Sequence, residues 1–191
     1  RGISFFLVDM QSQGIETRPL RQMTGDAEFD EVFFTDVALP ESALLGPING
    51  GWHVGMDILT KERGSIGAGA ITMQRRLDSL MSLADSELDP HTRQKLVMLL
   101  TQGKSYHFLG QRQGPDASVS SSLNKLGITE LMFDIANLRA NIAGIEALLD
   151  GSGSSSLLSA PGARIAGGTS QIQRNIIGER ILGLPKEPRP E

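Results

Sequence analysis

The chain has 191 residues, of which 39% are hydrophobic and 21% charged, and its formal net charge is −4. These values are ordinary for a soluble globular protein, and the lack of a basic surplus argues against nucleic acid as a partner. The sequence has no cysteine and only three scattered histidines, so disulfides and thiolate sites are excluded and we expect no metal. No apolar run approaches the roughly 18 residues of a membrane span, so we expect a cytoplasmic protein with no membrane partner.

The first part of the chain carries the pattern of short β-strands. An apolar run at residues 3–8 predicts a buried strand. Residues 15–20 predict an edge strand, because Pro19 cannot donate a ladder hydrogen bond. Residues 28–37 predict a third strand. The sequence begins inside a strand pattern without an initiator methionine, and we expect it to be the later part of a longer protein.

From Gly50 onward the apolar residues recur every three or four positions, which predicts helices. The first predicted helix runs to about Ala84. Three glycines interrupt its middle, at a cost of roughly 1 kcal/mol each against alanine, so they require a reason. Either another helix or a planar cofactor or thioester approaches the backbone there. These glycines are Gly64, Gly67 and Gly69.

Two more helices and a loop are expected next. Asp89-Pro90 predicts a helix start, because proline is tolerated in the first turn. A third helix is predicted over residues 118–149 from its apolar spacing. The Gly/Ser-rich stretch Gly151–Pro161 predicts a mobile loop.

The segment from Arg164 to Pro185 organises the end of the chain. Gly167-Gly168 gives the backbone freedom to adopt positive φ or to lie close to a ligand. Thr169 or Ser170 is expected to cap the helix that follows. A buried face is predicted for the isoleucines of this helix, which are Ile172, Ile176, Ile177 and Ile181. A glycine loop before a helix is a general anion or cofactor site, and a plain capped core helix is the alternative.

Strands and helices occur in blocks, which indicates an α+β fold. We expect a partial antiparallel β-domain at residues 1–48, followed by an antiparallel helical bundle at residues 49–191.

The run Gly168-Thr-Ser-Gln-Ile-Gln-Arg174, closing on Gly183-Leu-Pro185, resembles the C-terminal signature of the acyl-CoA dehydrogenase family. The resemblance covers nearly all of this chain but only the back half of a family member. It implies FAD-dependent α,β-dehydrogenation of an acyl-CoA thioester, with electrons passed on to electron-transfer flavoprotein. It also implies self-association to a dimer or tetramer.

The family reaction requires a carboxylate to remove the α-proton of the thioester. In most family members this glutamate directly precedes the Gly-Thr of the C-terminal signature, but Gly167 stands there and Ala166 precedes it. A second family arrangement places a Glu-Arg pair on the long first helix, and Glu62-Arg63 matches that pattern. The resemblance therefore implies Glu62 as the base; the alternative is a solvated surface residue in a charge run.

The resemblance also implies roles for neighbouring positions. Thr60, Arg63 and Gly168 would contact the acyl-CoA. The backbone N–H of Gly167 would donate to the thioester carbonyl, a role that survives any substitution except proline. Thr169 and Gln171 would reach the flavin.

Two other family motifs differ in this chain. The Arg-x-x-Phe-Gly stretch would fall near Leu88–Thr92, which reads Leu-Asp-Pro-His-Thr. The Gln-x-x-Gly-Gly-x-Gly loop would correspond to Gly151–Ser156, which reads Gly-Ser-Gly-Ser-Ser-Ser. These differences favour an alternative function, a non-catalytic subunit of a hetero-oligomeric acyl-CoA dehydrogenase that completes a partner's flavin site. A third interpretation is an interaction scaffold without catalysis.

Overall fold

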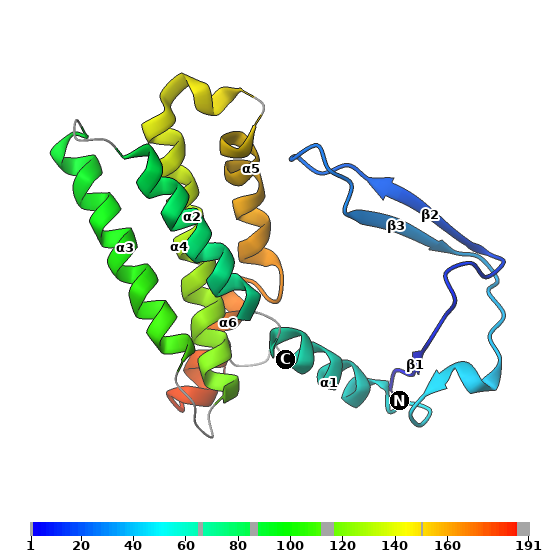
Figure 1. Cartoon of the computed structure of the whole chain (residues 1–191). Helices are drawn as coiled ribbons and strands as arrows, with labels where there is room; N and C mark the ends of the chain where they lie inside the picture. Colours follow the sequence, from blue (N-terminus) through cyan, green and yellow to red (C-terminus); the bar gives the residue numbers. More distant parts are fainter. Residues whose placement is uncertain (1, 65–66, 85–87, 112–116, 150, 187–191) are drawn as a thin grey trace. The chain divides into compact units, whose positions relative to one another are not determined.

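A computed structural model describes the backbone of residues 2–64, 67–84, 88–111, 117–149 and 151–186, and no side chains at 60–64, 67–70, 117–120 and 152 (Figure 1). The chain folds as two compact units, residues 1–62 and 63–191. The domain boundary expected between residues 48 and 49 follows the family's domain plan and stays a prediction.

The first unit contains two small antiparallel sheets. Strand β1 (Phe5–Phe6) pairs with β4 (Leu44–Leu45), and β2 (Ile15–Leu20) pairs with β3 (Phe29–Phe34). A 3₁₀ turn at Glu41–Ala43 precedes β4. The strand predicted at 3–8 is therefore shorter than expected, because only two of its residues have a partner strand.

Helix α1 (Gly51–Gly64) follows β4 in the chain. The backbone N–H of Gly51 donates to the carbonyl of Ile3 at 2.8 Å, so the start of α1 is tied to the beginning of the chain. The long helix predicted to Ala84 is found as α1 and α2 (Gly67–Leu83), and residues 65 and 66 lie outside the described part. The sequence predicts a close approach of a helix or a cofactor at Gly64, Gly67 and Gly69, and the surroundings of these glycines also lie outside the described part.

The second unit is a helical bundle in which α2, α3 (Pro90–Gly110), α4 (Ala117–Ala143) and α5 (Ser152–Ile165) run in alternating directions (Figure 1). Helix α6 (Ser170–Ile176) and a π-helical turn at Ile177–Ile181 end it. The predicted α+β class with an antiparallel bundle is confirmed. None of the helices within the described residues is both long and apolar enough to span a bilayer.

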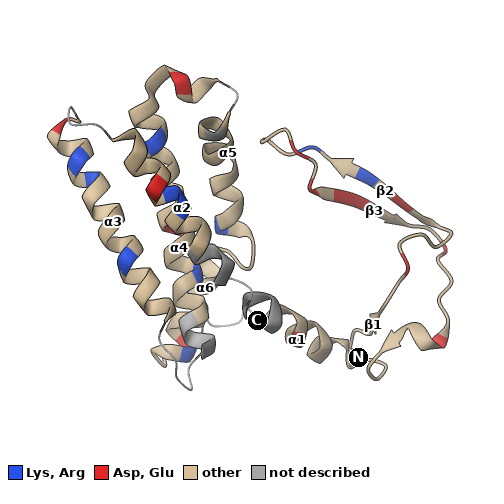
Figure 2. Ribbon diagram, viewed as in Figure 1, with Lys and Arg blue, Asp and Glu red and all other residues tan. Residues whose placement is uncertain are grey.

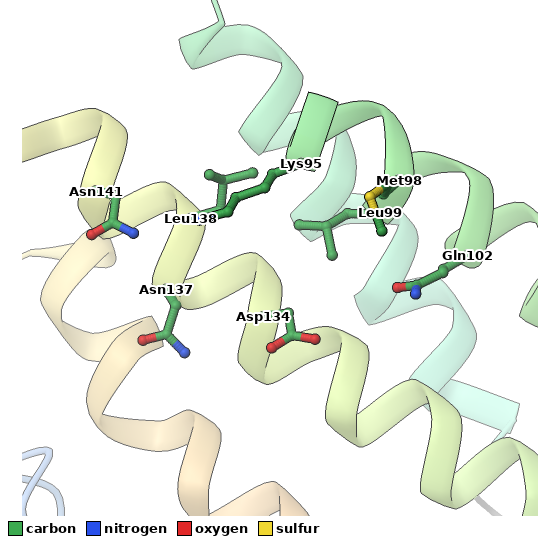
Figure 3. Close-up of a pocket in the computed structure, with 8 residues that line it drawn as sticks. All are labelled: Lys95, Met98, Leu99, Gln102, Asp134, Asn137, Leu138 and Asn141. Carbon is green, nitrogen blue, oxygen red and sulfur yellow. The ribbon is translucent and has the colours of Figure 1, made fainter. Parts of the chain in front are cut away.

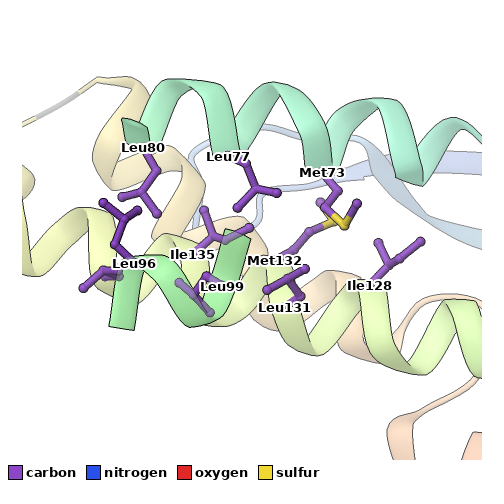
Figure 4. Close-up of a cluster of buried hydrophobic side chains, with 10 residues drawn as sticks. Met73, Leu77, Leu80, Leu96, Leu99, Ile128, Leu131, Met132 and Ile135 are labelled. Carbon is purple, nitrogen blue, oxygen red and sulfur yellow. The ribbon is translucent and has the colours of Figure 1, made fainter. Parts of the chain in front are cut away.

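The bundle core lies where α2, α3 and α4 meet (Figure 4). Large side chains such as Leu80, Leu131 and Ile135 are almost fully buried there. Apolar residues at helical spacing explain why these helices pack together, since each buried leucine or isoleucine contributes about 1.5–3 kcal/mol. The cluster consists of Met73, Leu77, Leu80, Leu96, Leu99, Ile128, Leu131, Met132, Ile135 and Leu138.

Helices α3 and α4 approach closely at a glycine. A Cβ atom added at Gly127 would collide with the ring of Tyr106. The ring of Tyr106 therefore occupies the space that any other residue at position 127 would need, which fixes how these two helices are placed along each other.

The prediction of a mobile loop at Gly151–Pro161 is wrong, because α5 begins at Ser152 and runs through this stretch. The hydroxyl of Ser154 accepts from the N–H of Gly151 at 3.1 Å and donates to its carbonyl at 3.0 Å, which caps the helix start. Ala160 is buried, so the helix is stabilised by packing that a Gly/Ser-rich composition does not reveal. Pro161 lies inside this helix.

The structure also differs from the prediction at two apolar helix faces. The helix predicted over 118–149 ends at Ala143, because Gly144 adopts φ +58° and a 3₁₀ turn follows at Gly144–Leu148. Ile145 and Leu149 are consequently exposed instead of buried. In α6 and the turn that follows, Ile172 is 49% exposed and Ile176, Ile177 and Ile181 are half-buried, while the fully buried positions are Ser170 and Gln173.

Candidate functional site

The candidate site is the glycine loop, which we define as residues 166–169 between α5 and α6. Ala166 ends α5 in an extended conformation, with its N–H donating to the carbonyl of Gly162 at 2.9 Å. Gly167 and Gly168 follow with φ of +65° and +99°. Two successive positive φ values are a conformation that only glycine adopts without strain, so the Gly-Gly pair is required by the turn. Thr169 caps α6, its hydroxyl accepting from the N–H of Ile172 at 3.3 Å.

The carbonyl groups of the glycine loop are held by two buried side chains. The ammonium of Lys125, on α4, donates to the carbonyl of Gly168 at 2.6 Å and to that of Arg164 at 3.0 Å. The amide of Gln173 donates from Nε2 to the carbonyl of Gly167 at 2.9 Å. Lys125 and Gln173 are 3% and 1% exposed, so these hydrogen bonds are shielded from water.

A carboxylate on α4 binds the flanks of the same loop. Glu130 accepts from the hydroxyl of Ser170 at 2.7 Å, and Arg164 Nη2 lies 3.1 and 3.0 Å from its two oxygens. Arg174 Nη2 lies 3.9 Å away. The hydrogen bond from Ser170, followed by the contact with Arg164, lowers the pKa of Glu130 below its ordinary value. The carboxylate is thus ionised at neutral pH and joins α4, α5 and α6.

Helix α4 carries both signs of charge next to this loop (Figure 2). Burial lowers the pKa of Lys125, partly offset by the nearby charge of Glu130. Burial and the charge of Glu130 raise the pKa of Asp134. The guanidinium of Arg164 lies 4.8 Å from the ring centre of Phe133, which adds a cation–π contact to its ion pair.

The N–H groups of the glycine loop are left for a ligand. Within the described part of the chain, we find no acceptor for the N–H of Gly167 or Gly168. No atom lies within 4 Å of a Cβ built at Gly167, so there is open space beside this residue. An arrangement of rigidly held N–H donors beside open space can stabilise a carbonyl oxygen that gains negative charge.

The structure brings together part of the predicted site. Gly167, Gly168 and Thr169 share the glycine loop, and Gln171 is exposed on the first turn of α6. Thr60, Glu62 and Arg63 belong to the backbone of α1, but their side chains lie outside the described residues. Their predicted roles stay predictions.

Sequence reasoning missed Lys125, Glu130 and Gln173. Lys125 does leave a signal, because Ile128, Met132 and Ile135 follow it at intervals of three and four residues. A lysine on the buried stripe of a helix is rare and needs polar partners. Gln173 belongs to the run Gly168–Arg174, but nothing in the neighbouring sequence indicates that its amide is buried.

A separate cavity of about 270 Å³ lies between α3 and α4 (Figure 3). Its lining mixes apolar and polar side chains, among them Lys95, Gln102, Asp134 and Asn137. The amide of Asn137 donates from Nδ2 to the carbonyl of Phe133 at 2.9 Å, so one of its hydrogen-bonding groups is already used. None of the residues that the sequence predicts as functional lines this cavity, so it is not part of the candidate site.

The two segments that differ from the family's flavin-binding motifs serve as helix starts. The side chain of Asp89 accepts from the N–H groups of His91 and Thr92 at 2.9 and 3.1 Å, which caps α3. Gly151 and Ser154 cap α5 in a similar way. The polar groups of these two segments are therefore used in capping the starts of α3 and α5.

Comparison with known proteins gives consistent matches. The family model described as acyl-CoA dehydrogenase, C-terminal domain, matches residues 49–182. The acyl-CoA dehydrogenase FadE34 of Mycobacterium tuberculosis is 33% identical over 192 residues, which cover 97% of this chain and 27% of FadE34. The acyl-CoA dehydrogenase IpdE1 of Mycolicibacterium smegmatis is 33% identical over 201 residues, covering 97% of this chain and 50% of IpdE1.

Solved structures share the fold. The crystal structure of the ChsE4-ChsE5 complex from Mycobacterium tuberculosis superposes with a TM-score of 0.74 at 20% identity, covering 96% of this chain and 54% of that one. This chain thus spans about half, or less, of the length of the relatives that it matches.

Proposed function

Because this chain belongs to the acyl-CoA dehydrogenase family, we propose that it contributes to the FAD-dependent α,β-dehydrogenation of an acyl-CoA thioester. The observation that carries the proposal is the glycine loop. Its carbonyls are turned toward buried donors, the N–H groups of Gly167 and Gly168 have no acceptor among the described residues, and the space beside Gly167 is open. The family resemblance assigns the donor to the thioester carbonyl to Gly167.

The proposed division of labour follows the roles that the family resemblance assigns. The carboxylate of Glu62 removes the α-proton of the acyl-CoA, and Arg63 and Thr60 orient the substrate. The N–H of Gly167 donates to the thioester oxygen as the α-carbon loses its proton, which lowers the barrier by an amount that is typically about 3–4 kcal/mol for one such donor. Gly168 lines the acyl-CoA site.

Bound FAD supplies the acceptor for the β-hydride in this family. Thr169 and Gln171 are the residues of this chain proposed to contact it. Gln171 is exposed at the start of α6, and so it is accessible to a ligand. The electrons are expected to leave for electron-transfer flavoprotein, and the proposed compartment is the cytoplasm.

A second function, the non-catalytic subunit, is supported by a different observation. Asp89 and the Gly151–Ser154 pair cap helices at the two segments where family members hold the ADP half of FAD. In addition, one structural neighbour is named as a complex of two different proteins. In this case the chain would complete a flavin site that a partner subunit dominates.

One variant tests the first function. Glu62→Gln keeps the size of the side chain but cannot accept a proton, so the full-length protein should bind flavin and acyl-CoA normally yet fail to reduce the flavin on anaerobic mixing. Asp57→Asn, which removes a carboxylate from an exposed position on the same helix, is the matched control and should reduce at the parental rate.

The outcomes separate the two functions. If Glu62→Gln reduces flavin as fast as the parent, the base lies elsewhere and the site assignment is wrong. If the parent protein never reduces flavin, either by itself or co-expressed with a partner, the dehydrogenase proposal fails. The non-catalytic subunit is supported if flavin is bound only after co-expression and Glu62→Gln does not slow its reduction.

A further inference from the structure

Lys125 is the most unusual buried group in the bundle. Its side chain is 3% exposed, and its hydrogen-bond partners within the described residues are the backbone carbonyls of Gly168 and Arg164. Glu130 is close enough to act on its charge but makes no ion pair with it among the described contacts. A buried ammonium without a direct counter-charge is costly, so it needs a compensating role.

Of the two carbonyls that Lys125 binds, one precedes the glycine loop and the other lies near its end. Arg164 precedes the end of α5, and Gly168 precedes the cap of α6. One side chain on α4 therefore fixes both ends of the connection. Gln173 holds the middle by donating to the carbonyl of Gly167.

The orientation of these carbonyls determines where the N–H groups point. In a trans peptide the C=O of one residue and the N–H of the next point in opposite directions. The chain has no cis peptide bond among its described residues. Since the carbonyls of Gly167 and Gly168 face Gln173 and Lys125, the N–H groups of Gly168 and Thr169 face away from these buried side chains. The N–H of Gly167 belongs to the preceding peptide, which lies between the held carbonyls of Arg164 and Gly167, so its orientation is constrained from both sides.

We propose that Lys125, together with Gln173, is a positioning residue: it holds the glycine loop in the left-handed conformation that aims the loop's N–H groups at the substrate before any ligand binds. This inference rests on the proposed function, because the substrate is the thioester assigned to Gly167. It adds a residue on α4, more than forty positions away in sequence, to the machinery of that site.

A bundle-stabilising role is the competing explanation, and a pair of variants separates the two. Lys125→Met keeps an unbranched chain and removes the donors. Leu138→Ala weakens the same helix 13 residues away, about 20 Å along its axis, in the core shared by α2, α3 and α4. Both variants are expected to lower the stability of the bundle, but only the first releases the loop.

Hydrogen exchange of the full-length protein reports the release without requiring activity. The N–H groups of Ala166, Ile172 and Gln173 donate to acceptors at the ends of the loop and are protected when it is closed. Lys125→Met should speed their exchange about tenfold or more, since leaving a buried carbonyl unpaired favours local opening. Leu138→Ala should leave them near the parental rate while speeding exchange in the core.

Flavin reduction at saturating acyl-CoA provides the second measurement. A misaimed donor affects the transition state more than the bound substrate, so Lys125→Met should lower kcat about tenfold or more with little change in KM. Unchanged exchange in Lys125→Met overturns the proposal. Faster exchange with parental kcat also overturns it, because the loop is then held by Lys125 without serving the reaction.

Two provisions keep the test decisive. If Lys125→Met does not fold, Gln173→Met removes the other buried donor and is judged by the same criteria. If the parent never reduces flavin, the proposed function fails, and the exchange rates then decide whether Lys125 holds the loop. Faster exchange in Lys125→Met supports the holding role, and parental exchange overturns it.

Discussion

Alanine at Gly168 tests the glycine loop most directly, and alanine at Gly167 and Gly162 provides matched comparisons. All three changes add one methyl group and restrict the unfolded chain equally, so differences between them report the folded state. Gly162 lies in α5 with no atom within 4 Å of an added Cβ, and its φ is not positive. Alanine there should stabilise the protein by about 0.5–1 kcal/mol.

The two loop positions should respond differently. At Gly167, φ of +65° falls in the left-handed region and the added Cβ meets nothing within 4 Å, so alanine should cost about 1–2 kcal/mol. At Gly168, φ is +99° and the added Cβ would lie 2.9 Å from Gln173 Nε2. Moving Gln173 would break its bond to the Gly167 carbonyl, so strain and overpacking together should cost roughly 3–5 kcal/mol.

Urea unfolding of the full-length variants at neutral pH measures these costs from the shift of the midpoint. The expected order of stability is Gly162→Ala, then the parent, then Gly167→Ala, with Gly168→Ala lowest. Equal midpoints for the two loop variants would refute the reasoning, because they would mean that Gln173 does not pack against Gly168. The positive φ also means that Gly167→Pro removes the N–H and forbids the conformation together, so proline does not isolate the donor.

Two further predictions concern charge and assembly. The pKa of Glu130 is lowered by its contacts with Ser170 and Arg164, so its stabilising effect is complete above its ordinary value of 4.5 and is lost as the pH falls through the lowered value. The difference in unfolding free energy between the parent and Glu130→Gln should therefore shrink toward acid pH. A difference that stays constant from about pH 3 to about pH 7 in denaturant unfolding would contradict this. We also expect at least a dimer, as the family buries faces of its helical domains between subunits, and a single-chain mass in sedimentation at micromolar concentration would count against it.

Local chemistry made two helix starts readable from the sequence. Asp89-Pro90 and Thr169 cap helices as predicted, because a side-chain acceptor for the first N–H groups is encoded within three residues. The Gly167-Gly168 pair predicts positive φ or a close approach to a ligand, and both glycines adopt positive φ.

Elements that depend on distant partners were not readable. The composition of α5 predicts a loop because glycine and serine disfavour helices locally, whereas packing against other helices decides the structure here. Within the candidate site, the glycine loop could be predicted, but the donors that hold it could not. Lys125 and Gln173 become site residues only through their contacts with the glycine loop. The helical period places Lys125 on a buried face but does not identify the carbonyls that it binds.

The contact between Gly127 and Tyr106 has a consequence for how this sequence can vary. Because the ring fills the space of the missing side chain, alanine at position 127 is sterically compatible only with a smaller residue at position 106. The two positions lie 21 residues apart and on different helices, so they constitute a coupled pair in which one change permits the other. Divergence at this crossing should therefore proceed through paired substitutions, with the ring lost before the methyl group is gained.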